Sequence, residues 1–178
     1  MNESTVHYHG KILDLQLETW ELPDGRHGEF EIVRHPGGAA VLPVLPDGRL
    51  LLMRQFRPAA GGFIVEIPAG RLEPGEPARQ CAERELCEET GWLAERLTEL
   101  GVIYSTPGFC DEQIHLFFGQ LHSRRSSARE ADEFIELFEV SLFEALRMID
   151  RGEIPDSKTQ LAILRYAQAQ TEPTDRTR

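Results

Sequence analysis

The sequence predicts an α/β domain with a mixed β-sheet and a small N-terminal antiparallel β extension. Strand-like segments come first, one helix-forming segment follows, and further strands and two C-terminal helices complete the chain. The 178 residues, 40% of them hydrophobic, are enough for one packed domain with a short extension. We expect the extension at residues 1–36, the main domain at 37–170 and a disordered tail at 171–178.

Turn residues divide the first part of the chain into short strands. Pro23-Asp24-Gly25 and Pro46-Asp47-Gly48 are both turn signals. Strands are expected at residues 30–34, 39–45, 50–56 and 64–67. Because the second turn signal stands directly between the two central segments, these segments predict a β-hairpin.

The clearest helix signal lies in the middle of the chain. Pro77 is suited to a first helical turn, residues 78–89 are rich in helix formers, and Gly91 stands just past the end. Ser141 and Ser157 are expected to cap two later helices. Those helices should reach about residues 151 and 170, and the remaining strands are expected at residues 101–104, 113–120 and 134–140.

The composition argues against several classes of partner. The formal net charge is −11, so the chain lacks the basic surface that non-specific nucleic-acid binding requires. No apolar run approaches the roughly 20 residues of a membrane helix. The first ten residues are polar and lack the pattern of a signal peptide. We therefore expect a cytoplasmic protein with no nucleic-acid or membrane partner.

Three carboxylates cluster on the central helix. Glu88 and Glu89 follow Glu85 by three and four residues, so all three share one side of it. At about 6 Å and an effective dielectric near 20, each like-charge contact costs roughly 3 kcal/mol before screening. A hard divalent cation, Mg²⁺ or Mn²⁺, would offset that cost. The alternative is a solvated acidic face that is paired with Arg79 and Arg84.

The residues around this cluster resemble the Nudix hydrolases. The Nudix motif, G-x5-E-x7-R-E-U-x-E-E-x-G-U with U a bulky apolar residue, matches Gly70, Glu76, Arg84, Glu85, Leu86, Glu88, Glu89, Gly91 and Trp92. The resemblance implies a Nudix fold, with a mixed sheet between helices. It also implies an ion pair of Arg84 with Glu76 that braces the loop. The implied metal ligands are Glu85, Glu88, Glu89 and the carbonyl of Ala69.

Segments outside the motif resemble the ADP-ribose pyrophosphatases in particular. Pro107 follows Trp92 by 15 residues, and residues 54–58 and 66–70 also fit their pattern. The resemblance implies Mg²⁺-dependent hydrolysis of ADP-ribose to AMP and ribose 5-phosphate. One alternative is a pyrophosphatase for GDP-mannose or another nucleoside diphosphate sugar. A second alternative, from another class, is a non-catalytic Nudix domain that senses a ligand.

The same resemblance names residues that contact the substrate or the attacking water. A guanidinium suits phosphate recognition, and Arg57 is expected to contact the substrate phosphates. Glu31 is expected to help hold the adenine. The resemblance also implies that Arg54 and Glu112 contact the substrate. The candidates for a catalytic role are Glu88, Glu112 and Glu133. Glu133 is preferred narrowly over Glu112 as the residue that aligns or deprotonates the water.

The N-terminal segment is expected to form a dimer interface. Relatives form homodimers in which N-terminal strands are exchanged between subunits. Residues 10–35 would supply those strands in this chain. The resemblance therefore implies a homodimer, with the extension at residues 1–36 as the dimerisation region.

Overall fold

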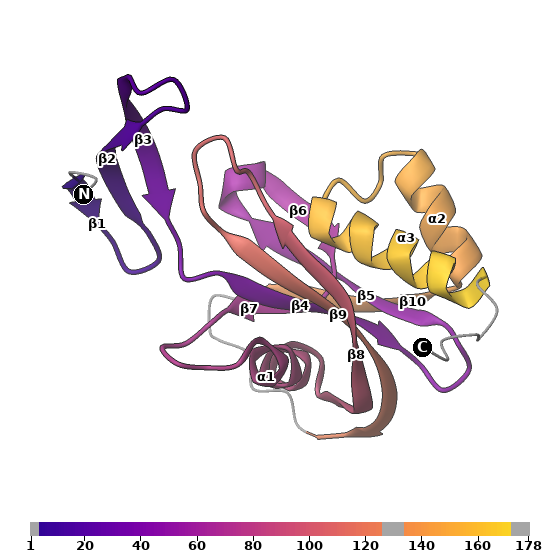
Figure 1. Cartoon of the computed structure of the whole chain (residues 1–178). Helices are drawn as coiled ribbons and strands as arrows, with labels where there is room; N and C mark the ends of the chain where they lie inside the picture. Colours follow the sequence, from indigo (N-terminus) through magenta and orange to yellow (C-terminus); the bar gives the residue numbers. More distant parts are fainter. Residues whose placement is uncertain (1–3, 126–133, 172–178) are drawn as a thin grey trace, which may run out of the picture.

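The computed structural model describes residues 4–125 and 134–171. Its N-terminal strands form a separate antiparallel sheet of order β1-β2-β3, which stands apart from the rest of the molecule (Figure 1). The strands are β1 (Ser4–His9), β2 (Asp14–Glu21) and β3 (His27–Arg34). The expected β extension is therefore confirmed. The sequence did not predict β1, because all six of its side chains are exposed and no apolar alternation marks it.

The described part of the main domain contains a seven-stranded sheet. Its order is β10-β5-β4-β9-β8, with β6 paired to β5 and β7 paired to β4. The sheet is mixed because β4 and β9 are parallel while the other pairs are antiparallel. Its strands are β4 (Gly38–Val44), β5 (Leu50–Arg57), β6 (Gly62–Glu66), β7 (Ala69–Arg71), β8 (Trp92–Tyr104), β9 (Gln113–Arg124) and β10 (Ile135–Val140).

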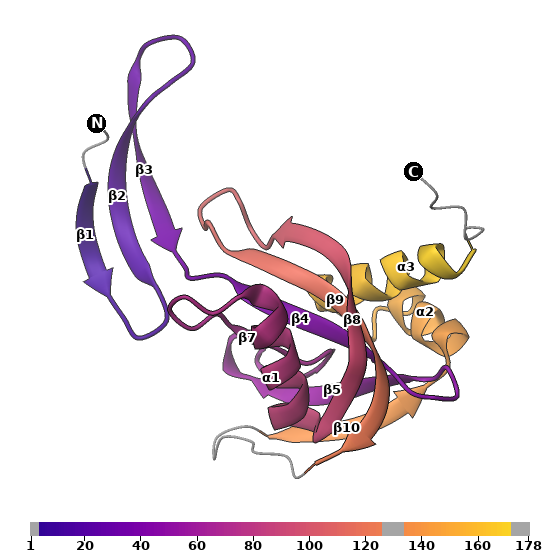
Figure 2. The ribbon, with the colours of Figure 1, turned by 60° about the horizontal axis from the view of Figure 1, so that its bottom comes forward.

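Helices cover both faces of this sheet (Figures 1 and 2). Helix α1 (Ala78–Thr90) covers one face, and Leu86 packs there in an apolar cluster with Leu51 and Leu97. Helices α2 (Leu142–Asp150) and α3 (Ser157–Thr171) cover the other face in a second cluster. A single 3-10 turn, Pro58–Ala60, links β5 to β6. The prediction of a mixed sheet between helices is confirmed.

The predicted hairpin of residues 39–45 and 50–56 is present only beside its turn. Val44 and Leu50 are the one residue pair that joins β4 to β5. The two strands then diverge, because β7 pairs with residues 38–40 on that side of β4. Strand β9 occupies the other side. Because β4 and β5 diverge, the segment that leads into α1 can pair with β4 as β7, in the middle of the sheet.

Two other boundaries differ from the prediction. Strand β8 begins at Trp92 rather than at residue 101, and three register shifts interrupt the alternation that would have indicated it. Asp156, rather than Ser157, caps α3, because its Oδ2 accepts hydrogen bonds from the amide and hydroxyl of Thr159. The predicted Ser141 cap of α2 is confirmed.

The C-terminal end of the chain is described only to the end of α3. That helix includes Thr171, and the rest of the predicted tail, residues 172–178, lies outside the described residues. Within the described residues, every helix is too short or too polar to cross a bilayer.

Candidate active site

Backbone geometry brings the start and the end of the motif together. Strand β7 leads into a loop and then into α1, which begins after Pro77 and ends at Gly91. Gly91 has φ of 72°, a left-handed conformation that glycine adopts without strain. The amide of Ala69 donates to Oε2 of Glu89 at 3.0 Å. The last turn of α1 is therefore held against the first residue of β7.

Two of the three clustered carboxylates are buried. Glu89 is 1% exposed and Glu85 is 9% exposed, whereas Glu88 lies further out. A Cβ atom on Gly70 would lie only 1.7 Å from Oε1 of Glu85. Only glycine at this position lets the backbone of β7 pass so close to the carboxylate. Glu85 and Glu89 are therefore not part of a solvated helix face, and that alternative is wrong for them.

One guanidinium joins the loop to the helix. Arg84 donates to both carboxylate oxygens of Glu76, at 2.9 and 3.0 Å, and also to Glu85 at 2.6 Å and Glu88 at 3.1 Å. The hydrogen bond from Arg84 lowers the pKa of Glu76 to about 2. The expected bracing pair of Arg84 and Glu76 is confirmed. Arg79 instead donates to the carbonyl of Leu97.

The chemistry of these side chains fits a hard divalent cation. Within residues 4–125 and 134–171, no three His, Cys, Asp or Glu side chains already converge as a metal cluster. The available donors are nevertheless oxygens, from Glu85, Glu88, Glu89 and the carbonyl of Ala69, which Mg²⁺ and Mn²⁺ prefer. Two of these carboxylates, Glu85 and Glu89, are buried. A bound divalent cation would offset the cost of burying their charge.

A cleft of about 310 Å³ opens beside the motif. It lies where β4 and β9 begin and where α3 starts, and its lining includes Gly70, Arg57, Glu112 and Lys158. Ala69 also lines it, so one wall is the backbone that contacts Glu89 and adjoins Glu85. The cleft thus has cationic side chains on one side and the carboxylate helix behind the other.

Arg57 is held in the cleft by a buried carboxylate. Its Nε and Nη2 donate to Glu66 at 3.1 and 2.8 Å. The side chain of Glu66 is 3% exposed. Such a two-point bond fixes the plane of the guanidinium and leaves Nη1 toward other acceptors. This orientation suits an anionic ligand.

Glu112 lines the cleft and lies beside His35. Oε1 of Glu112 lies 3.4 Å from Nδ1 of His35. Nδ1 also accepts a hydrogen bond of 3.1 Å from the amide of Gly37, so in that tautomer it has no proton to donate. The approach of Glu112 is then a contact rather than an ion pair. Glu112 thus presents carboxylate oxygens at the cleft.

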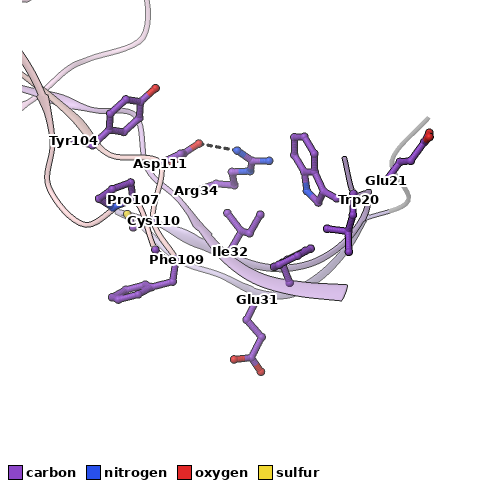
Figure 3. Close-up of a pocket in the computed structure, with 13 residues that line it drawn as sticks. Trp20, Glu21, Glu31, Ile32, Arg34, Tyr104, Pro107, Phe109, Cys110 and Asp111 are labelled. Carbon is purple, nitrogen blue, oxygen red and sulfur yellow. Dashed lines mark hydrogen bonds and ion pairs between the residues drawn. The ribbon is translucent and has the colours of Figure 1, made fainter. Parts of the chain in front are cut away.

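A second hollow, of about 460 Å³, lies between the N-terminal sheet and the β8–β9 loop. Figure 3 shows aromatic side chains, Trp20, Tyr104 and Phe109, around it. Arg34 crosses it and donates to Asp111 at 3.0 Å. Glu31 lines the hollow, but its carboxylate points away from the side on which Trp20 and Arg34 lie (Figure 3).

Comparison with known proteins assigns the family. Residues 34–159 match the NUDIX domain family, which is more than half of the chain. The chain belongs to the Nudix family. A solved Nudix-like structure described as an ADP compounds hydrolase superposes with a TM-score of 0.80 and covers 94% of this chain and 91% of that chain. At 20% identity, it shows the shared fold.

Several relatives of this Nudix chain are close in sequence. The ADP-ribose pyrophosphatase of Bacillus subtilis (strain 168) is 45% identical, over 88% of this chain and 85% of that protein. The methanol dehydrogenase activator of Bacillus methanolicus is 42% identical, over 92% and 89%. A GDP-mannose pyrophosphatase of Yersinia enterocolitica is 35% identical, over 76% and 74%. The names of these relatives thus differ, and two of them state different substrates, ADP-ribose and GDP-mannose.

The structure brings some predicted residues of the Nudix site together and separates others. Arg57, Glu112 and Ala69 line the cleft, and Glu85 and Glu89 of the Nudix helix contact the backbone of its β7 wall, while Glu88 is bonded to Arg84. Glu31 lies at the other hollow. Arg54 is exposed and, three residues from Arg57 on the same strand, points to the opposite face of the sheet. Glu133 lies outside the described residues.

Sequence reasoning named Arg57 among the cations of the Nudix cleft but missed Lys158 and Arg71, which also line it. Lys158 lines the cleft, and its Nζ lies 3.2 Å from Glu66 and 2.9 Å from Asp156. The available signal was scarcity, because Lys158 is one of only two lysines among 19 basic residues. Only the fold places it beside Arg57, 101 residues earlier in the chain.

Proposed function

We propose that the chain hydrolyses the diphosphate of ADP-ribose to AMP and ribose 5-phosphate, with Mg²⁺ as the cofactor and Mn²⁺ as its substitute. The observation that carries the substrate is the 45% identity with an ADP-ribose pyrophosphatase over 88% of the chain. The reaction class is supported by the site. Buried carboxylates for a cation and an oriented arginine lie on either side of one cleft.

Divalent cations are generally required by Nudix hydrolases. Glu85, Glu88, Glu89 and the carbonyl of Ala69 would hold such a cation, which would supply the positive charge that an anionic diphosphate needs at an acidic protein. Arg57 binds the phosphate oxygens, and Arg84 with Glu76 keeps the loop and the helix in register. A water oxygen then bonds to phosphorus as the bridging P–O bond breaks.

A carboxylate accepts the proton of that water. Glu133 is our first choice, and Glu112 is the rival because it faces the cleft. Glu88 lies at the outer edge of the carboxylate group, paired with Arg84. Its role in our proposal is that of a metal ligand that also helps to place the water. Glu31, at the second hollow, is proposed to contact the part of the substrate beyond the diphosphate, whereas the expected contact of Arg54 is not proposed again, because its side chain points to the opposite face of the sheet from Arg57.

A panel of nucleoside diphosphate sugars tests the proposal. We expect ADP-ribose, with Mg²⁺, to give AMP and ribose 5-phosphate at the highest kcat/KM of the panel. The specific rival is GDP-mannose, because several relatives are GDP-mannose pyrophosphatases. An equal or higher kcat/KM for GDP-mannose refutes the ADP-ribose assignment and keeps the reaction class. Saturable binding without metal-dependent turnover of any member indicates a ligand sensor.

The N-terminal sheet is proposed to form a homodimer. Large apolar side chains are exposed on it, among them Val6 at 52%, Tyr8 at 59% and Phe30 at 43%. Apolar exposure of this kind marks surfaces that bind a partner. Light scattering at assay concentration is expected to give the mass of two chains, and a monomer rejects the dimer. A cytoplasmic location likewise remains our prediction.

A further inference from the structure

A hydrogen-bonded junction joins the β8–β9 loop to the end of β3. The amide of Val33 donates to the carbonyl of Phe109 at 2.7 Å, and the amide of Asp111 donates to the carbonyl of Val33 at 3.1 Å. Val33 and Cys110 thereby form a short parallel bridge. The loop is thus fixed to the strand that leads from the N-terminal sheet into the main domain.

The side chain of Asp111 strengthens this junction with both of its oxygens. Oδ1 accepts a hydrogen bond of 2.8 Å from the amide of His35, and Oδ2 accepts one of 3.0 Å from Nη1 of Arg34 (Figure 3). Arg34 also donates to Glu18, whose side chain is 4% exposed. Because this two-point bond to a buried carboxylate fixes the plane of the guanidinium, Nη1 is presented to Asp111 in one direction. Asp111 is therefore held from two sides.

Glu112 directly follows this aspartate and lies at the cleft. Asp111 lines the hollow beside the N-terminal sheet, whereas Glu112 lines the cleft beside the Nudix motif. The carbonyl of Glu112 accepts a hydrogen bond of 3.1 Å from the amide of Ser105, which closes the base of the loop. His35 touches both acids, since its amide binds Asp111 and its Nδ1 lies 3.4 Å from Glu112. The bonds of Asp111 therefore set the backbone position from which Glu112 reaches the cleft.

The tip of the same loop is exposed, which makes this anchoring matter. Pro107, Gly108 and Phe109 are all exposed. An exposed loop tip makes few buried contacts and opens at a low free-energy cost. A displacement of about 1 Å at a group that acts on a substrate can lower the rate about 100-fold. Fixing Asp111 to β3 therefore affects the chemistry at the cleft as well as the stability of the loop.

We propose that Asp111 is a positioning residue, which acts through Glu112 by holding that carboxylate toward the substrate in the cleft. Arg34 and the amide of His35 fix Asp111, so the N-terminal sheet takes part in placing a group of the active site. This inference rests on the proposed function in that it assumes that Glu112 contacts the substrate or the attacking water. It assigns a role to a residue that lies outside both the cleft and the Nudix motif.

A double-mutant cycle between Asp111 and Glu112 tests whether one acts through the other. The enzyme with Mg²⁺ is assayed on the nucleoside diphosphate sugar of the panel that it hydrolyses best. Asp111→Asn keeps the size of the side chain but removes its charge, and we expect kcat/KM to fall about 10- to 100-fold. In Glu112→Gln the same change should lower kcat/KM less than about 3-fold, because the carboxylate that Asp111 positions is already gone. Equal losses in both backgrounds overturn the inference.

Asp24 offers a matched control. Its Oδ1 accepts from the amide of Arg26 at 3.1 Å and its Oδ2 accepts from Nε of Arg26 at 2.8 Å, so its donors are also an amide and a guanidinium. It lies in the exposed turn between β2 and β3 and lines neither the cleft nor the hollow. Asp24→Asn should keep the wild-type kcat/KM. A loss as large as that of Asp111→Asn contradicts the inference.

Hydrogen exchange gives a readout that does not depend on turnover. The amide of Ser105 reports on the position of Glu112, because it donates to the carbonyl of that residue. We expect Asp111→Asn to speed exchange of the Ser105 amide about tenfold or more, while the amides that pair β4 with β9 keep their rates. An unchanged Ser105 rate overturns the inference. If Asp111→Asn does not fold, Asp111→Glu, which keeps the charge but moves it by one methylene, replaces it in both experiments.

The outcomes separate this inference from the proposed function. A higher kcat/KM for GDP-mannose overturns the ADP-ribose assignment, and unequal losses in the two backgrounds on that substrate still support Asp111. Equal losses, together with the best turnover on ADP-ribose, overturn the inference alone. No turnover of any member of the panel overturns both proposals.

Discussion

The amide of Ala69 lies 3.0 Å from Oε2 of Glu89 and donates a hydrogen bond to it. This bond joins the two ends of the Nudix motif and holds a 1% exposed carboxylate beside a main-chain carbonyl that can also bind a cation. Glu89 therefore combines a structural contact with a proposed metal contact, and a substitution can separate the two.

Glu89→Gln should abolish most of the activity without unfolding the protein. Glutamine still offers an oxygen to the amide of Ala69, but it lacks the charge that a divalent cation requires. We expect kcat/KM to fall by about 100-fold or more, with a melting temperature near that of wild type. Steady-state kinetics across a Mg²⁺ titration give the measurement. Glu83→Gln, on the exposed side of the same helix, is the control, and equal losses in both variants would refute the metal assignment.

Gly70→Ala should disturb the same site sterically. The new methyl carbon meets Oε1 of Glu85 at 1.7 Å, so either β7 or the carboxylate must move. We expect a loss of about 1–3 kcal/mol in unfolding free energy, together with a lower kcat/KM. Urea denaturation and kinetics measure the two effects. Gly62→Ala is the control because its methyl group has open space, and a Gly70→Ala variant as active as this control would show that the close approach is not needed.

The ion pair of Glu76 with Arg84 should make stability depend on acid pH. The pKa of Glu76 is lowered from 4.5 to about 2 by the hydrogen bond from Arg84. The native state therefore keeps this carboxylate ionised where the unfolded chain protonates it. The stability that it contributes is present above about pH 4.5 and is lost as the pH falls toward 2.

Denaturation of wild type and Glu76→Gln from pH 7 to pH 2 measures this contribution. The difference in unfolding free energy should be largest near neutral pH and should shrink below pH 4.5. Glu73→Gln, an exposed neighbour in the same loop, is measured alongside as the control for removing a carboxylate. A difference between wild type and Glu76→Gln that stays constant with pH contradicts the assignment.

Arg34 should matter for both stability and activity, because it links the N-terminal sheet to the β8–β9 loop. It donates to the buried Glu18 at 2.7 and 2.6 Å and to Asp111, the residue before Glu112. Arg34→Met removes the positive charge and the two hydrogen bonds that stabilise the buried carboxylate of Glu18. We therefore expect a loss of about 2 kcal/mol in unfolding free energy. Arg26→Met breaks an exposed pair with Asp24, which solvent screens, and should cost far less than Arg34→Met. Equal effects in urea denaturation would show that Arg34 is dispensable.

Comparison of Glu133→Gln with Glu112→Gln should identify the base. Removing a general base lowers kcat by about 100- to 10,000-fold, while the loss of a binding contact mainly raises KM. We expect the larger loss of kcat in Glu133→Gln, and the pH–rate profile should lose its acidic limb in the same variant. A larger loss in Glu112→Gln reverses the assignment.

Local patterns predicted most of the individual elements. The limits of α1 follow from Pro77 and Gly91, and the Ser141 cap of α2 follows from its hydroxyl. Strand β1 and the first half of β8 escaped prediction for physical reasons. Side chains of β1 are exposed on both faces, and register shifts interrupt β8, so neither strand shows the alternation that marks a half-buried strand.

The motif likewise predicted the carboxylate helix but not the cleft. Spacing along one helix places Glu85, Glu88 and Glu89 on one side, because the helical period is local. Nothing local relates Arg57 to Lys158, or indicates that Glu66 is buried between them. Those contacts exist because β4 and β5 diverge and β6 carries Glu66 to the start of α3.

The sequence by itself determined the family, the helix that carries the proposed metal ligands and the Arg84–Glu76 brace, since each depends on spacing within one short segment. Only the tertiary structure decided that Glu31 and Arg54 lie away from the cleft, that Glu112 faces it and that Lys158 stands beside Arg57. Such placements depend on how distant strands pair and where a helix begins against them. These are non-local interactions, which no short pattern of residues encodes.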